Sequence, residues 1–270
     1  GLGKTVQVIA FLAHLHETNA LMPALVVVPK SLMKNWQREI GRFAPDIRRI
    51  LLHRGPNRTK DAHHLALYEV VITTYATLRR DQFILGQVAW STIVCDEAQN
   101  VKNPTANVTA AVKGMKAGLR MAVTGTPVEN GLSELWCIMD FAQPGKFGSG
   151  RDFRDNFERP IVDAEAGTEI RLEASRRLQN RLVPHYVRRT KEQELKDLPP
   201  KTSKTYSALM GARQKNAYAR VLKSVADGET IAISGLTKLI QACSHAELVE
   251  PTGADAAQLL QESPKLTKTI

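Results

Sequence analysis

The chain opens on residues whose types and spacing could hold the phosphates of a nucleotide. The first five residues read Gly-Leu-Gly-Lys-Thr and lead directly into a helical pattern. They match the end of a phosphate-binding loop, in which glycines let backbone N–H groups approach phosphate oxygens and a helix N-terminus adds partial positive charge. Lys4 would reach the β- and γ-phosphates, and the hydroxyl of Thr5 would bind Mg²⁺. Alone, this run also fits an ordinary glycine-rich helix start before a chance Lys-Thr pair.

Two adjacent carboxylates, Asp96 and Glu97, follow an apolar run that has the pattern of a buried strand. Ligands of open α/β sheets bind at the carboxyl ends of strands, where this pair is expected to lie. Asp96 would hold Mg²⁺ directly or through water, and Glu97 would polarise the attacking water. The two residues can have different roles because adjacent side chains on a strand point apart. A simple polar junction is the alternative. The phosphate-loop run 92 residues earlier (96 − 4) disfavours it.

A third run, Ala-Val-Thr-Gly-Thr-Pro at 122–127, again ends a strand pattern in a small, hydroxyl-rich turn. Thr124 and Thr126 can donate hydrogen bonds to the acidic loop or to the γ-phosphate, and Gly125 allows close backbone approach. By itself this run indicates only a turn. As the third member of an ordered series, it predicts the element that links the nucleotide to a nucleic-acid track.

These motifs need a sheet that brings strand ends to one edge, and the first half of the chain predicts one. Expected strands lie at 24–28, 47–52, 70–73, 92–95 and 120–124. Expected helices lie at 4–16, 32–43, 75–83, 104–115 and 132–141. Strands such as 24–28 are apolar throughout, as they are when helices cover both faces of a parallel sheet. The alternation predicts an α/β fold with a doubly wound parallel sheet.

The character of the sequence changes after residue 146. Residues 151–198 are densely charged with mixed sign, and predict a helical insertion or protrusion. The run Leu198-Pro-Pro-Lys201 is a breaker; beyond it we expect one strand at 202–209, helices at 212–226 and 236–243, and a loop with a short helix at 251–263. The predicted domains are therefore 1–146, 147–200 and 201–270.

Composition bounds the class of protein. The 270 residues carry a net charge of +10, and residues 1–150 hold 17 basic and 11 acidic side chains. This excess beside the motifs predicts a polyanionic partner such as nucleic acid. No stretch approaches the roughly 20 apolar residues of a membrane span, and no signal peptide begins the chain. We expect a soluble intracellular protein, in the cytoplasm and nucleoid or in the nucleus, with no membrane partner.

Several other residues favour a structural interpretation. The three cysteines lie far apart without a CxxC pair, so they are expected to be small buried residues. His63-His64 lacks a metal-ligating neighbour at suitable spacing and predicts a solvated helix face. Trp36 and Trp136 fall in helical patterns and are expected to be core residues rather than base-stacking platforms. The glycine-rich run 145–150 follows a helix and predicts a flexible junction.

Taken in order, the motifs closely resemble those of the Swi/Snf-type ATPases of helicase superfamily two. The runs that carry the resemblance are GLGKT, VVVPKSLMKNWQREI, VVITTYATL, DEAQNVKNP and AVTGTPVENGLSELW. Further matches are VRRTK, LPPK and a final SPKL. The Lys-Asn after DEAQ, and the Glu-Asn and Leu-Trp after TGTP, separate this family from ordinary RNA helicases. The resemblance covers essentially the whole chain, and its spacing agrees.

The resemblance implies a RecA-like first motor lobe, of the P-loop NTPase class, with ATP and Mg²⁺ as cofactors. Matched positions that bind the nucleotide are Gly1, Gly3, Lys4, Thr5, Thr124, Gly125 and Thr126. Matched catalytic positions are Lys4, Asp96, Glu97 and Gln99, with Thr5 and Asp96 as the metal ligands. Gln99 has the position that couples hydrolysis to the track.

The resemblance also implies contacts with the backbone of double-stranded DNA. The matched positions are Pro29, Lys30, Ser31, Thr74 and Tyr75. Such phosphate contacts carry no sequence information. Family members track along duplex DNA without separating its strands, which implies translocation and the remodelling of a DNA-bound protein complex. The Arg188-Arg189 pair could contact DNA or pair locally.

The chain begins inside the phosphate loop and ends near the start of a second RecA-like lobe, so the fold is expected to be incomplete at both ends. In the family that lobe supplies arginines in cis, and an arginine finger is worth about 10³–10⁵ in rate. We therefore expect these 270 residues alone to be inactive. The Gln-Ala-Cys-Ser-His run at 241–245 departs from the family's usual Cys-Asn-His-Pro. A strand-separating DNA or RNA helicase and a non-catalytic nucleic-acid-binding scaffold are the alternatives, and the intact Lys4, Asp96 and Glu97 disfavour the scaffold.

Overall fold

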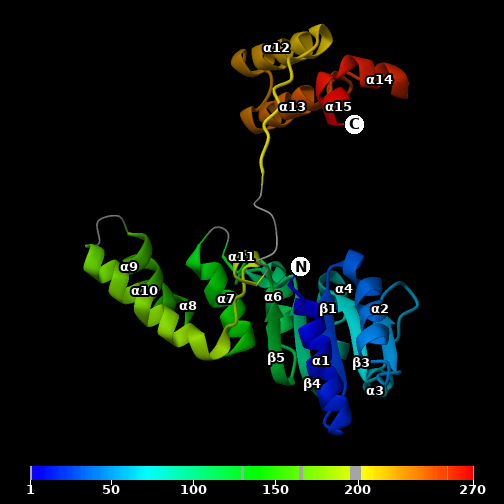
Figure 1. The fold of residues 1–270 in the computed structure, drawn as a ribbon, viewed down its shortest axis with the longest axis vertical. Helices are drawn as coiled ribbons and strands as arrows, with labels where there is room; N and C mark the ends of the chain where they lie inside the picture. Colours follow the sequence, from blue (N-terminus) through cyan, green and yellow to red (C-terminus); the bar gives the residue numbers. More distant parts are fainter. Residues whose placement is uncertain (1, 129–130, 164–166, 195–201, 254, 270) are drawn as a thin grey trace. The chain divides into compact units, whose positions relative to one another are not determined.

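The computed structural model describes residues 2–128, 131–163, 167–194, 202–253 and 255–269. The chain divides into two compact units, Gly1–Lys196 and Asp197–Ile270 (Figure 1). Within the described residues, no helix is both long enough and apolar enough to cross a membrane.

The first unit is built on a five-stranded sheet. Its strands are β1 Ala24–Val28, β2 Ile50–His53, β3 Val70–Thr74, β4 Trp90–Asp96 and β5 Ala117–Val123. Their order is β2-β3-β1-β4-β5, and each neighbouring pair is parallel. All five expected strands and the α/β fold are thus confirmed. β2 begins three residues later than expected and β5 three residues earlier. Before β2, the N–H groups of Arg48 and Arg49 donate to the carboxylate of Glu69, which lies just before β3.

Helices cover both faces of the sheet, which explains why the strands are apolar on both sides. On one face α1 (Lys4–Glu17) and α2 (Met33–Phe43) form a core with β1, and on the other lie α4 (Tyr75–Arg80), α5 (Gln82–Leu85), α6 (Asn107–Lys113) and α7 (Leu132–Ala142). The short elements η1 (Lys30–Leu32), α3 (Ala62–Ala66) and η2 (Ala98–Val101) connect them. The single helix expected at 75–83 is broken at Asp81, whose buried carboxylate binds Arg58 and His53.

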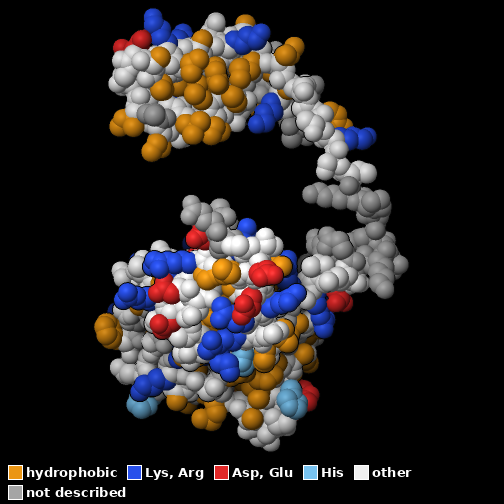
Figure 2. Space-filling view, turned by 90° about the vertical axis from the view of Figure 1, so that its left-hand side faces the viewer, with side chains coloured by type: hydrophobic (Ala, Val, Ile, Leu, Met, Phe, Trp, Pro, Cys, Tyr) orange, Lys and Arg blue, Asp and Glu red, His pale blue; other side chains and the backbone are white. Residues whose placement is uncertain are grey.

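A helical segment follows α7 and confirms the helical character expected there. It comprises α8 (Gly150–Phe153), the π-helix η3 (Arg154–Glu158), α9 (Arg159–Val162), α10 (Thr168–Leu182), η4 (Val183–His185) and α11 (Lys191–Glu194). Its core is a small cluster in which Phe153, Phe157 and Leu178 pack against Leu135 and Met139 of α7. Figure 2 faces this side of the unit and shows acidic and basic side chains interspersed. The expected breaker at 198–201 lies outside the described residues.

The regular elements of the second unit, in the part of it that the structure describes, are all helices. Its elements are α12 (Ala212–Ala226), α13 (Ala232–Ser244), η5 (Ala246–Leu248), α14 (Ala256–Glu262) and α15 (Pro264–Thr269). The expected helix at 212–226 is confirmed, and the one expected at 236–243 begins four residues earlier. The strand expected at 202–209 is wrong: these residues are exposed and pair with none of the described strands. Their residue types favour an extended chain, but a strand also needs a partner for its backbone hydrogen bonds.

Candidate functional site

The strand ends that carry the predicted motifs meet at one edge of the sheet. In the parallel register Val28 of β1 lies beside Thr74 of β3, and Asp96 of β4 lies beside Val123 of β5. Because β1 also pairs with β4, all four strands end in one row. The loops that follow them therefore share the carboxyl edge, the usual place for a ligand in an open α/β sheet.

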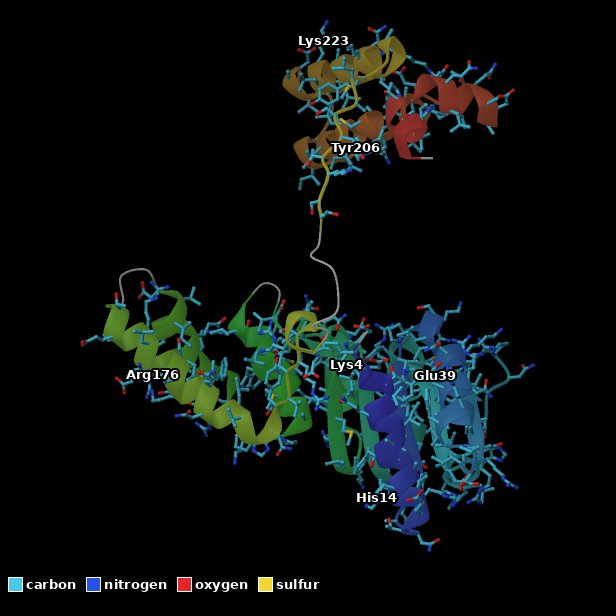
Figure 3. All side chains as sticks on the ribbon, viewed as in Figure 1. Lys4, His14, Glu39, Arg176, Tyr206 and Lys223 are labelled. Carbon is cyan, nitrogen blue, oxygen red and sulfur yellow. The ribbon has the colours of Figure 1, made fainter. Side chains whose placement is uncertain are left out.

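The phosphate-loop residues begin α1 at the same end of the unit. Figure 3 shows Lys4 at the upper end of α1, well above His14, and Figure 1 shows α4, which follows β3, at the same upper level of the unit. Gly3 has a φ of 75°, a left-handed conformation that favours glycine, and Lys4 is exposed. The helical hydrogen bonds start with the N–H of Gln7, so the N–H groups just before it remain for an anion. The backbone thus fits a phosphate; Gly1 lies outside the described residues.

Asp96 is buried, with 6% of its surface exposed, and is held by defined hydrogen bonds. The indole Nε1 of Trp36 donates to its Oδ2 at 2.8 Å. The backbone N–H of Glu97 donates to its Oδ1 at 3.0 Å. The hydroxyl of Tyr75 donates to its backbone carbonyl at 2.6 Å. The carboxylate therefore has a fixed orientation at the end of β4.

A chain of hydrogen bonds connects Glu97 to the hydroxyl-rich turn after β5. Gln99 Nε2 donates to Glu97 Oε2 at 2.8 Å, and Thr124 Oγ1 donates to Gln99 Oε1 at 2.8 Å. The N–H of Thr126 then donates to Thr124 Oγ1 at 3.1 Å. Glu97 has a φ of 51°, which is costly for a residue with a side chain and is found mostly where function requires it. The left-handed backbone at Glu97 directly follows Asp96, the last residue of β4. Gly125, between the two threonines, is exposed.

The residues predicted to contact DNA lie at the neighbouring ends of β1 and β3. Lys30 and Ser31 are exposed in η1, directly after Pro29. Thr74 caps α4, where its hydroxyl accepts a bond from the N–H of Thr77 at 3.1 Å. Tyr75 differs from the others because its side chain is buried, and burial raises the pKa of its hydroxyl. Its phenol reaches Asp96, so only its backbone remains for a contact with DNA.

The carboxylates at the edge do not form a metal cage by themselves. No group of three or more His, Cys, Asp and Glu side chains with metal-binding geometry occurs in the part of the chain that the structure describes. Mg²⁺ commonly keeps several waters and is bound by one or two carboxylates together with phosphate oxygens. One hydroxyl and one carboxylate, as the predicted ligands Thr5 and Asp96 would supply, fit an ion of this type whose remaining ligands come from nucleotide and water.

Two groups of interactions were not foreseen from the sequence. Trp36 is a core residue as expected, but its indole also binds Asp96. At the end of β2, His53 contacts Asp81 at 2.9 Å, and Arg58 binds the same carboxylate. Burial lowers the pKa of His53. Burial alone would raise the pKa of Asp81, but the hydrogen bonds from Arg58 and His53 lower it. The buried partners are far apart in sequence, which is why local patterns missed them.

The other residues that received a structural interpretation are the cysteines, the His63-His64 pair and Trp136. The cysteines are free, with Cys95 and Cys137 buried, and His63-His64 is exposed on α3. Arg189 is exposed and lies 3.7 Å from Glu194. The indole of Trp136 donates to the carbonyl of Gly148 at 3.1 Å, in the junction before α8.

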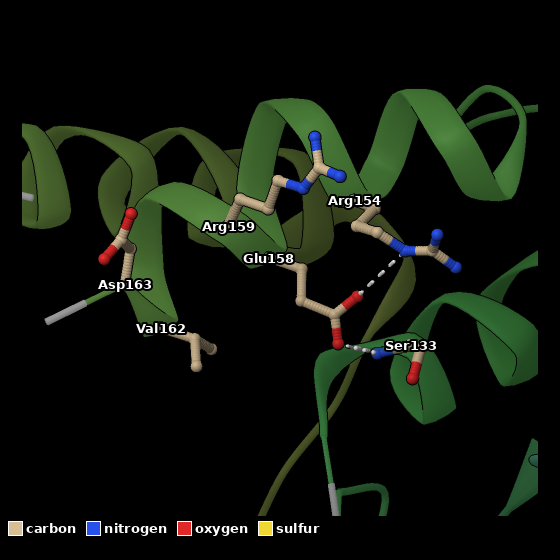
Figure 4. A pocket seen from close by; sticks show the side chains of 6 residues that line it. All are labelled: Ser133, Arg154, Glu158, Arg159, Val162 and Asp163. Carbon is tan, nitrogen blue, oxygen red and sulfur yellow. Dashed lines mark hydrogen bonds and ion pairs between the residues drawn. The ribbon is translucent and has the colours of Figure 1, made fainter.

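A surface hollow of about 610 Å³ lies in the helical segment instead. Figure 4 shows the side chains that line it, with Glu158 accepting the N–H of Ser133 and approaching Arg154. None of the predicted site residues lines this hollow.

The profile of the SNF2-related domain matches residues 1–250. The chain belongs to the SNF2-related domain family. This confirms the resemblance that the motifs indicated. The chain is 36% identical over 263 residues to the "Putative ATP-dependent helicase/translocase YwqA" of Bacillus subtilis, covering 92% of this chain and 28% of that protein. It is 30% identical over 296 residues to the "TATA-binding protein-associated factor MOT1" of Saccharomyces cerevisiae, covering 96% and 16%.

Solved structures of this SNF2 family have the same fold. The chain is similar to the "Sulfolobus solfataricus SWI2/SNF2 ATPase core in complex with dsDNA", with a TM-score of 0.66 and 35% identity over 100% of this chain and 57% of that one. The sheet is thus that of a RecA-like lobe. The chain spans less than a third of the length of the curated relatives described above.

Proposed function

We propose that this chain is the ATP-binding lobe of a DNA-dependent ATPase, which converts hydrolysis into movement along double-stranded DNA. The main support for this proposal is the chain of hydrogen bonds from Glu97 through Gln99 to Thr124. It joins the carboxylate expected to act on water to the turn after β5, on the edge that also carries the turns expected to meet DNA. A scaffold would have no use for such a connection.

The proposed ATP site uses the start of α1 and the end of β4. Backbone N–H groups after Gly3, together with Lys4, would hold the phosphates, and Thr5 and Asp96 would hold Mg²⁺. When bound, Mg²⁺ neutralises charge that develops on the phosphate oxygens. Glu97 would orient the attacking water, because Gln99 fixes its carboxylate by a charge-assisted hydrogen bond. Thr124, Gly125 and Thr126 would respond to the γ-phosphate.

The proposed track is the phosphate backbone of duplex DNA. Lys30, Ser31 and Thr74, with the backbone of Pro29 and Tyr75, offer the cation, hydroxyls and N–H groups that phosphates bind. The related Sulfolobus core was solved with double-stranded DNA, which supports a duplex rather than RNA. The Saccharomyces relative is named for its association with TATA-binding protein, so we include remodelling of a DNA-bound protein complex, in the nucleoid or nucleus.

The proposed organisation places the ATP-binding lobe at 1–146, a helical insertion at 147–200, and a connector with the start of a second lobe at 201–270. The chain covers 57% of the Sulfolobus core, which is consistent with further elements of the motor beyond these residues. Arginines of a second RecA-like lobe in cis would complete the ATP site. We therefore predict negligible ATP hydrolysis by these 270 residues alone.

The test separates nucleotide binding from DNA binding in the full-length protein. Lys4→Ala removes the cation of the phosphate loop, and Lys223→Ala, on an exposed face of α12, is the matched control. Binding of a fluorescent ATP analogue should weaken by about 10- to 100-fold in Lys4→Ala, the usual cost of a hydrogen bond to a charged group. Affinity for duplex DNA should stay unchanged, as should both affinities of the control. Unchanged nucleotide binding in Lys4→Ala would refute the phosphate-loop assignment.

A further inference from the structure

The two carboxylate oxygens of Asp96 are each engaged by a different donor. Oδ1 accepts the N–H of Glu97 and Oδ2 accepts the indole of Trp36, at 3.0 and 2.8 Å. An ionised carboxylate offers about four lone-pair sites, so both oxygens keep capacity for a cation or its bound water. The hydrogen bonds therefore fix the orientation of the carboxylate and leave lone pairs on both oxygens for a further ligand.

Trp36 and Tyr75 hold the end of β4 from opposite faces of the sheet. Trp36 is 1% exposed and belongs to the core formed with α1 and α2, whereas Tyr75 is 8% exposed and belongs to the core formed with α4 to α7. Trp36 binds the Asp96 side chain, and Tyr75 binds its backbone carbonyl. Both donors are embedded in close-packed cores, so a movement of either helix would be transmitted to Asp96.

Each donor also sits in a helix that begins at a turn expected to contact DNA. Trp36 lies in α2, which starts at Met33 immediately after the turn of Lys30–Leu32. Tyr75 is the first residue of α4, whose cap is Thr74. Trp36 is therefore less than two helical turns from Lys30 and Ser31, and Tyr75 directly follows Thr74.

We infer that Trp36 and Tyr75 are positioning residues that fix Asp96 from both faces of the sheet and connect it to the two DNA-contacting turns. The inference rests on the proposed function. A simpler account holds that a buried indole or phenol needs any acceptor. That simpler account predicts the same loss of unfolding free energy wherever such a hydrogen bond is removed, with no particular effect at Asp96. Trp136, whose half-buried indole donates to Gly148, and Tyr68, whose half-exposed hydroxyl lies 3.3 Å from His64, provide an indole and a phenol away from the edge for comparison.

The experiment uses four variants of the full-length protein: Trp36→Phe, Tyr75→Phe, Trp136→Phe and Tyr68→Phe. Each removes one hydrogen-bonding group and keeps an aromatic ring. Mn²⁺ serves as the metal probe, and its binding is followed by electron paramagnetic resonance with a non-hydrolysable ATP analogue. Partners that orient a metal ligand typically change metal affinity by about 10-fold or more. We expect half-saturating Mn²⁺ to rise by about 10-fold in Trp36→Phe and by less in Tyr75→Phe, with wild-type values in the two controls.

The second readout is the ratio of ATP hydrolysis with and without duplex DNA. It should fall in Trp36→Phe and Tyr75→Phe, while affinity for the same duplex without nucleotide stays unchanged in Trp36→Phe. Wild-type Mn²⁺ binding in both variants would overturn the positioning role. Shifted Mn²⁺ binding with an unchanged ratio would overturn the connection to DNA.

Two other results would also bear on the inference and on the proposed function. If Trp36→Phe does not fold, as judged by its circular dichroism and Tm, Tyr75→Phe decides the inference because it removes a single oxygen atom. Failure of the wild-type protein to bind the ATP analogue would instead contradict the proposed function.

Discussion

The carboxyl edge of the sheet and the helical segment after α7 are both rich in polar side chains, but they use them differently. At the edge, bonds join residues far apart in sequence: Trp36 and Asp96 are separated by 60 positions, and Gln99 and Thr124 by 25. In the helical segment, Arg159 pairs with Asp155 one turn away with both side chains exposed, and a long-range bond joins the N–H of Ser133 in α7 to Glu158.

This difference separates polar groups that define a geometry from those that keep a surface hydrated. An exposed pair four residues apart on a helix contributes a few tenths of a kcal/mol, since water competes for both charges. A buried donor such as the indole of Trp36 must find a partner, and the partner is then fixed in place. The site is therefore expected where long-range polar bonds converge, whereas the stability of the helical segment comes from its phenylalanine cluster.

The largest effect on stability should come from that cluster. Phe153→Ala empties a fully buried position and should cost about 3–5 kcal/mol in the unfolding free energy of the helical segment. Hydrogen exchange of α8 to α10 measures this cost. Leu172→Ala, half-exposed on α10, is the control and should cost far less. If Phe153→Ala also abolished nucleotide binding, the two regions would not be independent.

The next largest effect should come from the hydrogen-bond chain at the sheet edge. Gln99→Ala removes the bridge between Glu97 and Thr124, and should lower DNA-stimulated kcat by about 10-fold, as for one hydrogen bond to a charged group. The KM for ATP should change little. Steady-state kinetics of the full-length protein measure both, with exposed Gln179→Ala on α10 as the control. Equal losses in the two variants would contradict the comparison.

A smaller effect is expected on DNA binding. Lys30→Ala removes one phosphate contact, and should weaken duplex affinity severalfold while reducing the salt slope by about 1. Fluorescence anisotropy at several salt concentrations measures that slope. Arg176→Ala, on an exposed part of α10, should leave it unchanged. A larger change in Arg176→Ala would place the track on the helical segment.

The smallest effect should come from the exposed ion pair. Arg159→Ala breaks the contact with Asp155 and should change the unfolding free energy by less than about 0.5 kcal/mol. Urea denaturation at low and high salt tests this. A loss above 1 kcal/mol would show that surface pairs hold the segment together.

The sheet and its site edge could be predicted because short-range patterns encode them. Residues 24–28 are apolar on both faces, and Asp96 ends such a run. The bond from Trp36 could not be predicted, since burial of an indole follows from helical periodicity but the identity of its acceptor depends on packing 60 positions away. The prediction of a strand at 202–209 was wrong for a related reason. Its residue types favour an extended chain, but they do not show whether a partner strand lies beside it.

The proposed function requires that duplex DNA stimulates an ATPase built on this edge. The most direct test is ATP hydrolysis by the full-length protein with duplex DNA, single-stranded DNA or RNA, and with Glu97→Gln as the control. We expect strong stimulation by duplex DNA that is lost in Glu97→Gln. Stimulation by RNA or single strands alone would indicate a strand-separating helicase. No hydrolysis under any condition would contradict the proposed ATPase and favour a scaffold.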